Sequence, residues 1–276
     1  MVDKNTLYVV GTPIGNLGDF SPRAAQTLAD VDFIAAEDTR VTLKLLNHLG
    51  IKKPMVSYFE HNKAQRTSEI CQRILKGESC AVVSDAGMPC ISDPGEDLVR
   101  ECGNLGIKTV VIPGPSALIS ALCVSGLATG RFTFEGFISV NKKSRKEHLE
   151  SLLNEKRTMI FYEAPHKLSN TLKDLYTYFG ERKLTIVREI TKIHEEVIRT
   201  TTKAAYESIE ENPLKGEIVL VLEGKTEEVP EEMTLSDAVS LANSYIAEGL
   251  KISDAAKKAA TISGLKKNEI YRELTK

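Results

Sequence analysis

The stretch CAVVSDAGMPCISDPG, residues 80–95, carries more information about the fold than any other part of the chain. Its first four residues are apolar and predict a buried strand. The next twelve contain two glycines, two prolines and two aspartates. Glycines such as Gly87 allow close backbone approach, and prolines such as Pro89 stiffen a loop. We therefore predict a rigid small-molecule cradle at the carboxyl end of a parallel strand, rather than a simple connection.

Strands and helices alternate on both sides of this loop. The pattern predicts strands at 7–10, 32–36, 54–58, 80–83 and 108–112, and helices at 39–49, 63–76, 95–105 and 115–125. Such alternation is typical of right-handed crossovers and a parallel sheet with helices on both faces. We assign residues 1–125 to an N-terminal α/β domain.

The next hundred residues follow a different pattern. Predicted strands lie at 132–137, 157–163, 183–189, 195–202 and 217–223, and predicted helices at 143–154, 165–179 and 203–211. The third and fourth strands are too close in sequence for a crossover helix, so they should be antiparallel. Residues 126–226 are therefore predicted to form a second α/β domain with a mixed sheet.

The remaining residues, 227–276, read as a linker and a helical tail. An acidic, proline-containing segment at about 225–233 precedes helical patterns at 235–248, 254–262 and 267–274. Ser253 is the predicted N-cap of the second helix. Residues 263–265 predict a tight turn before the third, so the tail resembles a helix-turn-helix.

Composition narrows the possible functions. The chain has 276 residues, 42% of them apolar and 27% charged, as in ordinary globular proteins. Neither a signal peptide nor a membrane span is predicted. Five cysteines without CxxC spacing fit a reducing cytoplasm and argue against a thiolate metal site. With a net charge of −2, any nucleic-acid binding must come from local basic patches.

Three well-known functional motifs are present only in part, because a required residue or spacing is missing. Gly11, Gly15 and Gly18 do not have the GxGxxG spacing of dinucleotide sites. Gly224 begins a GKT triplet, but the earlier glycine of a phosphate-binding loop is replaced by Val219. His194 begins an HE pair without the second histidine of a zinc hydrolase. Nucleotide hydrolysis and metal-dependent hydrolysis therefore lose support.

Three glycine- and proline-rich loops remain, at 11–16, 84–89 and 113–117. Each directly follows a predicted parallel strand, so all three should lie at one edge of the sheet. A cleft lined by main-chain groups suits a ligand with a flat base and many polar atoms. S-adenosylmethionine fits this description, whereas the lysines expected around a triphosphate are missing.

Charged residues gather at other strand ends. FYEAPHK (161–167) and REITKIHEE (188–196) place them beside apolar strands, which favours a polar substrate site. His166 and His194 are more simply explained as exposed structural residues. Asp38 is a candidate helix cap. Arg40 and the basic run 142–146 are candidates for binding nucleic-acid phosphates.

Eight segments occur in an order that resembles the tetrapyrrole methylase superfamily, the class III S-adenosylmethionine-dependent methyltransferases. They are VGTPIGNLGD, AEDTR, SDAGMPCISDPG, PGPSA, FEGF, FYEAPHKL, REITKIHEE and KGEIVLVLEG, over about residues 7–224. More closely, they resemble the branch that methylates small-subunit ribosomal RNA. The resemblance implies 2′-O-methylation of a cytidine ribose in the decoding region of 16S rRNA in the 30S subunit. It also implies a cytoplasmic homodimer with two α/β domains and a small helical domain.

The resemblance also implies site residues. The cofactor contacts carried over are Pro13, Asp85, Ala86, Gly87, Met88, Pro89, Ser116, Ala117, Tyr162, Gly216 and Glu217. Residues 91–95 are expected to shape the loop rather than to contact the cofactor. Met88 stands where threonine is common in the family, and Lys167 where arginine is common. The GTPIGN loop differs from the GxGPGD loop of corrin and sirohaem methylases, which favours RNA over a tetrapyrrole.

We expect direct in-line methyl transfer to the ribose 2′ oxygen without a metal. Lys192, Glu195 and Glu163 are the candidate proton acceptors because they crowd the strand ends of the second domain. Phosphates are expected to contact Arg40, Lys142, Lys143, Arg145, Lys146 and Arg188. Two alternatives stay open: a class III methylase of a tetrapyrrole, a protein side chain or another small substrate, and a non-catalytic RNA-binding protein.

Overall fold

The computed structural model describes residues 2–226 and 233–276. The chain divides into two compact units, the first ending at Lys225 and the second beginning at Thr226. Most of the predicted acidic linker, residues 227–232, lies outside the described residues. The boundary predicted at residue 125 falls inside the first unit and stays a prediction.

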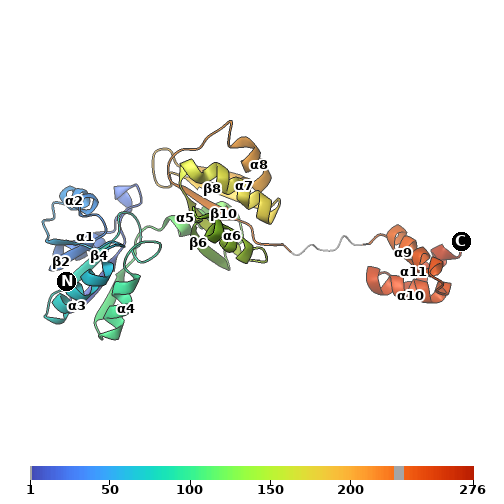
Figure 1. Cartoon of the computed structure of the whole chain (residues 1–276), viewed down its shortest axis with the longest axis horizontal. Coiled ribbons are helices and arrows are strands. Elements are labelled where there is room, and N and C mark those ends of the chain that lie inside the picture. Colours follow the sequence, from blue (N-terminus) through green and yellow to red (C-terminus); the bar gives the residue numbers. More distant parts are fainter. Residues whose placement is uncertain (1, 227–232) are drawn as a thin grey trace. The chain divides into compact units, whose positions relative to one another are not determined.

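The first unit begins with a five-stranded sheet in the order β3-β2-β4-β1-β5 (Figure 1). Its strands are β1 (Thr6–Val10), β2 (Phe33–Ala36), β3 (Met55–Ser57), β4 (Cys80–Val83) and β5 (Lys108–Ile112). All neighbouring pairs are parallel. The predicted parallel sheet is confirmed, and its strands all end at the same edge.

Helices cover both faces of this sheet, as predicted. On one face lie α1 (Pro22–Asp30) and α2 (Thr39–His48), packed against Tyr8 and Val10. On the other lie α3 (Lys63–Leu75) and α4 (Glu96–Asn104), packed against Leu7 and Val9. This alternation follows from the two-residue period of a strand. We did not predict α1; its local signal is Ser21, whose side chain caps the helix just before a proline.

The second sheet is mixed, as predicted, with strand order β6-β7-β10-β8-β9. It contains β6 (Phe132–Phe137), β7 (Thr158–Glu163), β8 (Lys183–Arg188), β9 (Glu196–Thr201) and β10 (Ile218–Leu222). The β6–β7 pair is parallel, and the other pairs, including the predicted β8–β9 pair, are antiparallel.

Helices also cover both faces of the second sheet. One face packs against α6 (Lys142–Ser151), α7 (Leu168–Phe179) and α8 (Thr202–Ser208). The other packs against α5 (Ala117–Ser125) through Leu118 and Leu122. Helix α5 follows β5 directly but belongs by its packing to the second sheet. The loop 113–116 therefore leads from one sheet to the other.

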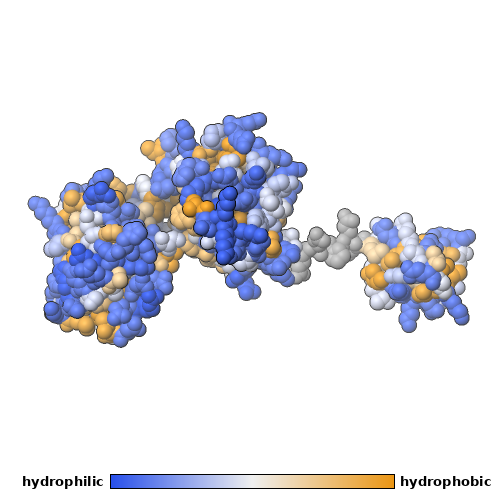
Figure 2. Space-filling model, viewed as in Figure 1, coloured by the Kyte–Doolittle hydropathy of each residue, from blue (hydrophilic) through white to orange (hydrophobic). Residues whose placement is uncertain are grey.

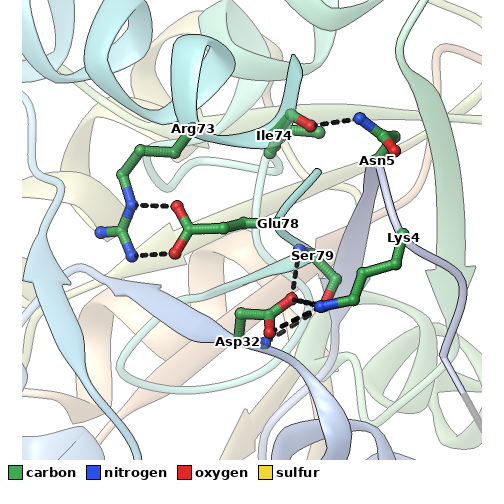
Figure 3. Close-up of polar contacts among 7 residues, drawn as sticks. All are labelled: Lys4, Asn5, Asp32, Arg73, Ile74, Glu78 and Ser79. Atoms are coloured by element: carbon green, nitrogen blue, oxygen red, sulfur yellow. Dashed lines mark hydrogen bonds and ion pairs between the residues drawn. The ribbon is translucent and has the colours of Figure 1, made fainter. Parts of the chain in front are cut away.

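A polar cluster lies at the amino ends of β2 and β4, opposite the edge that carries the glycine loops (Figure 3). Asp32 accepts hydrogen bonds of 2.7 Å from both the amide and the hydroxyl of Ser79, and pairs with Lys4 at 3.0 Å. Burial alone would raise the pKa of Asp32. The hydrogen bonds from Ser79 and the pair with Lys4 outweigh it and lower this pKa to about 2. The cluster therefore stabilises the folded state.

The second unit is a small three-helix domain. It contains α9 (Leu235–Ala247), α10 (Ile252–Ser263) and α11 (Lys267–Leu274) around an alanine-rich core. The predicted turn is confirmed, because Gly264 ends α10 in the left-handed region at φ +72°. The predicted N-cap at Ser253 is wrong. The carbonyl of Lys251 already accepts from Asp254 and Ala255, so the helix begins at Ile252 without a side-chain cap.

The surface mixes hydrophilic residues with small groups of hydrophobic ones in the view of Figure 2. Within residues 2–226 and 233–276, no helix is long and apolar enough to cross a membrane.

Candidate active site

The three glycine loops meet at the carboxyl edge of the first sheet. The Thr12 amide donates to the Gly87 carbonyl at 2.9 Å, and the Gly87 amide donates back at 3.2 Å. Gly11 and Gly114 lie so close that a Cβ on Gly114 would be 2.8 Å from the Gly11 Cα. The first and third loops cross at these two residues. Glycine is needed there because a Cβ atom would overlap the backbone of the other loop. The predicted convergence of the loops is confirmed.

A cavity of about 410 Å³ lies against these loops and is closed by the strand ends of the second sheet. From the first half it is lined by Ile14, Glu37, 85–88, 91–93 and 116–118. From the second half it is lined by Phe137, 162–165, Val187, Ile190 and 217–219. Its wall is apolar with a few convergent polar groups, as in small-molecule sites.

Most of the proposed cofactor residues lie on this wall. They are Asp85, Ala86, Gly87, Met88, Ser116, Ala117, Tyr162 and Glu217. Pro13, Pro89 and Gly216 do not line it. Gly216 has φ +90°, and a Cβ there would lie 2.4 Å from the Glu189 side chain. Gly216 therefore supports the wall by allowing this close contact with Glu189.

The second half of the long loop also reaches the cavity. We expected residues 91–95 only to shape the loop, but Ile91, Ser92 and Asp93 line the wall. The reason is local backbone geometry: Cys90 and Ser92 have φ of +73° and +62°. These left-handed residues turn the chain back toward the cavity. Side-chain periodicity does not reveal such turns, because non-glycine residues seldom adopt positive φ.

Three carboxylates gather at one end of the cavity. Glu37 accepts from the Asp85 amide at 3.2 Å, and Asp85 accepts from the Asp38 amide at 3.1 Å. Burial raises the pKa of all three lining groups, Glu37, Asp85 and Asp93. For Asp93 the pKa reaches about 6, with repulsion from Glu37 adding to the effect of burial. Sequence reasoning gave Glu37 no role, although it directly follows a predicted strand.

An aromatic surface forms another part of the cavity wall. The Tyr162 ring contacts Phe134 and Phe137 edge to face, with centroid distances of 4.9 and 5.6 Å. The Tyr162 hydroxyl accepts from the amide of Leu118 at 3.1 Å and so ties β7 to the first turn of α5. Phe137, which we did not predict, is 57% exposed at the cavity. The wall therefore offers flat apolar surface to a ligand.

Of the three proton-acceptor candidates, only Glu163 lines the cavity. It is 3% exposed, and its carboxylate accepts from the Ala164 amide at 2.8 Å and from the Thr171 hydroxyl. Both oxygens therefore have partners within the protein. Glu195 is exposed and accepts from the Thr191 amide at 2.6 Å, which closes the turn between β8 and β9.

Lys192 does not line the cavity itself, but it pairs with a glutamate that does. Its ammonium group lies 3.0 Å from Glu189 and 3.1 Å from Glu217, and Glu217 lines the wall. Burial by itself would lower the pKa of Lys192, but the hydrogen bonds to the two glutamates outweigh it, so the pKa is raised. The stem of Lys192 packs over Gly15 of the first loop. Lys192 is thus held as an ammonium beside the cavity.

The structure separates the proposed phosphate-binding residues into two groups. Arg40, Lys142, Lys143 and Lys146 are exposed. Asp38 caps α2, as predicted, and also pairs with Arg40. Arg145 is instead 15% exposed, ion-paired with Asp174 and bonded to the Thr171 hydroxyl. The Arg188 side chain is 19% exposed and occupied by Glu196 and the His194 carbonyl.

Two solved structures share the fold of this chain. The chain is similar to diphthine synthase, with a TM-score of 0.57 and 15% identity over 79% of this chain and 90% of that one. It is also similar to uroporphyrin-III-C-methyltransferase from Thermus thermophilus, with a TM-score of 0.56 and 17% identity over 79% of this chain and 94% of that one. At such low identity these likenesses establish the fold alone.

Sequence comparisons narrow the class to a family. The model of the Tetrapyrrole (Corrin/Porphyrin) Methylases matches residues 6–206. The chain is 48% identical to ribosomal RNA small subunit methyltransferase I of Synechocystis over 96% of both proteins. It is 46% identical to the protein of the same name from Halalkalibacterium halodurans, over 98% of this chain and 94% of that one. The chain therefore belongs to the tetrapyrrole methylase family, in the group of the ribosomal RNA small subunit methyltransferases I.

The family implies S-adenosylmethionine as the cofactor, and the cavity fits it. The loop 85–88 offers main-chain groups, while Tyr162 and Phe137 offer a flat apolar surface for a base. Glu37 and Asp85 are acceptors for hydroxyl or amino groups and can face a positive charge. Within the part of the chain that the structure describes, no cluster of three or more His, Cys, Asp or Glu could hold a metal.

Proposed function

We propose that this protein is an S-adenosylmethionine-dependent methyltransferase that methylates the 2′ oxygen of a cytidine ribose in 16S rRNA. The observation that carries the proposal is 48% identity, over 96% of the chain, to a ribosomal RNA small subunit methyltransferase I. The cavity at the crossing of three glycine loops supports it, because it suits a nucleoside cofactor. The substrate is the rRNA of the 30S subunit, and the site of action is the cytoplasm.

The protein contributes binding, orientation and exclusion of water. When bound, S-adenosylmethionine supplies a methyl group that a ribose oxygen can attack. The rigid glycine crossing at Gly11 and Gly114 fixes the loops before the ligand binds, which lowers the entropy lost on binding. The aromatic wall at Tyr162 excludes water from one side. Alignment of this kind is the main demand of a direct transfer.

Lys192, Glu195 and Glu163 remain the proposed participants around the acceptor oxygen. As an ammonium beside Glu217, Lys192 is suited to stabilise negative charge that develops on the 2′ oxygen. Glu195 closes the turn that carries Lys192. Glu163 presents its hydrogen-bonded carboxylate at the wall, where it can orient the ribose hydroxyl and accept its proton as the oxygen–methyl bond forms and the bond from sulfur to methyl breaks.

Replacement of Lys192 tests this assignment. We expect Lys192→Ala to lower kcat for methyl transfer by about 10²-fold, in line with the loss of one stabilising group. Lys192→Arg, the matched control, keeps the charge and should retain more activity. The affinity for S-adenosylmethionine, measured by calorimetry, should change little. Near-normal rates in both Lys192→Ala and Glu195→Ala would reject these two residues as participants.

Four exposed cations are proposed to hold rRNA phosphates: Arg40, Lys142, Lys143 and Lys146. The three lysines lie on or beside the exposed face of α6, where Lys143 and Lys146 make only loose pairs of 3.9 and 3.7 Å with Glu147 and Glu150. Such cations can exchange partners for phosphates at little cost. Arg40 is paired with Asp38 but 87% exposed. Arg145 and Arg188 are both paired and largely buried, so they are proposed to contribute less.

The function is tested in two steps. Calorimetry should first show binding of S-adenosylmethionine. Purified 30S subunits and naked 16S rRNA should then be incubated with methyl-labelled cofactor, and the rRNA digested and analysed as nucleosides by mass spectrometry. The expected product is 2′-O-methylcytidine. A labelled product without ribose methylation, or methyl transfer to a small substrate that is indifferent to RNA, would overturn the proposal.

We also propose that the protein acts as a homodimer. Large apolar side chains stand exposed on the first unit, among them Ile193 at 97%, Val140 at 71% and Val111 at 56%. Burial of such side chains against a second copy of the chain would remove apolar surface from water. Light scattering after size-exclusion chromatography should give twice the chain mass of 30.4 kDa; a monomer at micromolar concentration would refute the dimer.

A further inference from the structure

A second cavity, of about 680 Å³, lies beside the first. It is lined by residues that follow β3 (59–61 and 63), by residues 90 and 92–95 of the long loop, and by residues 96–97 at the start of α4. The two cavities share Glu37, Ser92 and Asp93, so these residues form a common wall. Any group held in the second cavity therefore borders the cofactor cavity directly.

One side of the second cavity is aromatic. Phe59 is 37% exposed and lies edge to face with the His61 ring, with a centroid distance of 6.2 Å. An exposed aromatic side chain at a cavity wall is a surface on which a nucleobase can stack. Phe59 follows the buried Tyr58, which lies just beyond the end of β3. The Tyr58 amide donates to the Ala36 carbonyl of β2 at 2.8 Å, which ties the chain before Phe59 to the sheet.

Some carboxylates of the second cavity are paired with cations and others are not. Lys63 pairs with Glu60 at 2.8 Å and with Asp97 at 2.9 Å. Arg100 pairs with Asp97 and lies 3.4 Å from Glu96, so these three carboxylates share two cations. The two carboxylates of the common wall, Glu37 and Asp93, have no cation within ion-pair distance among the residues that the structure describes. The wall next to the cofactor cavity is therefore rich in hydrogen-bond acceptors and repels phosphate.

These observations match the chemistry of an amino-bearing base. Carboxylates accept hydrogen bonds from the exocyclic N4 amino group of cytosine, whereas uracil presents an acceptor oxygen at the same place. A base that is taken out of its stack and held in a pocket also brings its own ribose close to the pocket wall. In this protein that wall faces the cofactor cavity.

We propose that the second cavity holds the base of the nucleotide that is methylated, stacked on Phe59, with Glu37 and Asp93 accepting hydrogen bonds from its exocyclic amino group. This inference rests on the proposed function and adds to it the residues that select the base. It assigns Phe59, Glu37 and Asp93 as specificity residues for a cytosine over a uracil.

The first test compares two substrates within each variant. Subunits are reconstituted with 16S rRNA that carries C or U at the position where the wild-type protein places the methyl group. At saturating S-adenosylmethionine we expect the wild type to prefer C over U by at least about ten-fold in kcat/KM. Asp93→Asn and Glu37→Gln supply amide donors and should reduce this ratio several-fold. Because the ratio is taken within one variant, any change in cofactor binding cancels.

The second test concerns stacking on Phe59. Phe59→Ala should lower kcat/KM for 30S subunits by about ten-fold or more, and Phe59→Tyr should restore it. Calorimetry should give the same S-adenosylmethionine affinity for all three proteins. Leu75→Ala is the matched control, because Leu75 is an exposed apolar side chain on α3 that lines neither cavity.

A third measurement does not depend on catalysis. Subunits with 5-iodocytidine at the target position are irradiated in complex with the protein, and tryptic peptides are analysed by mass spectrometry. The expected crosslink lies in residues 54–63. Crosslinks confined to the second half of the chain, or an unchanged C-to-U ratio in both carboxylate variants, would overturn the proposal. If the wild type methylates no rRNA at all, the proposed function itself fails, and that outcome is seen before any variant is made.

Discussion

Two carboxyl groups in this protein, Asp93 and Asp32, have pKa values shifted in opposite directions by the groups around them. Asp93 lies on the wall that both cavities share and faces Glu37, Asp85 and the Ser84 hydroxyl, with Glu96 and Tyr162 nearby. Asp32 lies among hydrogen-bond donors at the other edge of the sheet (Figure 3). The first environment disfavours the carboxylate, and the second favours it.

Replacement of Asp93 should therefore stabilise the protein at neutral pH. Its pKa is raised from an ordinary 3.8 to about 6, because burial and neighbouring carboxylates penalise the charge. The folded state loses stability as pH rises from about 4 through 6, and the loss is complete above that range. We expect Asp93→Asn to gain about 1 kcal/mol at pH 7 and nothing at pH 4. Urea denaturation at both pH values checks this; an equal gain at both would show that charge is not the cause.

Replacement of Asp32 should have the opposite effect. Its pKa of about 2 lies below the ordinary 3.8, so its contribution is present above pH 4 and is lost as pH falls through about 2. With about a third of the side chain exposed, we expect Asp32→Asn to cost about 1–2 kcal/mol at pH 7. The difference from wild type should shrink in denaturant titrations between pH 4 and 2. The exposed Asp19 provides a control that should change little.

At the scale of elements, the crossing of the first and third glycine loops is the feature on which the cavity depends. Neither Gly11 nor Gly114 has a positive φ, so the requirement comes from space alone. The loop 84–89 joins the crossing through the Thr12–Gly87 bridge. Three strands separated in sequence thereby hold their loops in one arrangement.

A methyl group at this crossing should disturb both the fold and the site. Gly114→Ala places a Cβ 2.8 Å from the Gly11 Cα and 2.9 Å from its carbonyl carbon. We expect a loss of about 1–3 kcal/mol in unfolding free energy and at least about ten-fold weaker S-adenosylmethionine binding. Gly103→Ala in α4 is the matched control, since its Cβ would meet nothing within 4 Å. Equal stability of the two variants would contradict a role for the crossing.

At the scale of the whole molecule, the two units differ in what they contribute to the cavities. The cofactor cavity and the second cavity are lined entirely by residues before 220. The second unit has its own alanine-rich core and lines neither cavity with any described residue. Residues 251–276 carry seven Lys or Arg and three Asp or Glu, which suits contact with rRNA phosphates.

A chain that ends at residue 226 should therefore still bind S-adenosylmethionine and transfer its methyl group. We expect its affinity for S-adenosylmethionine to stay within about two-fold of wild type, while KM for 30S subunits rises several-fold as phosphate contacts are lost. Calorimetry and initial rates measure both quantities. Loss of cofactor binding on truncation would show that the second unit supports the first.

The sequence by itself determined most of the helices and strands, with α1 as an exception. It also determined the parallel character of the first sheet and the three loops of the cavity. Alternating strand and helix patterns, glycines that end helices and short connections between strands each involve only a few neighbouring residues. They can therefore be recognised from the sequence alone. The antiparallel β8–β9 pair follows in the same way from a connection too short for a crossover.

Only the tertiary structure decided which of these residues are available to a ligand. Arg145 reads as part of a basic patch, yet Asp174 and Thr171 occupy it. Helix α5 follows the first sheet but packs on the second, because its apolar partners Val219 and Val221 lie about a hundred residues later. Left-handed turns at Cys90 and Ser92 bring Asp93 to the wall that joins the two cavities. Charge pairing, burial and loop direction depend on partners distant in sequence, and no local pattern records them.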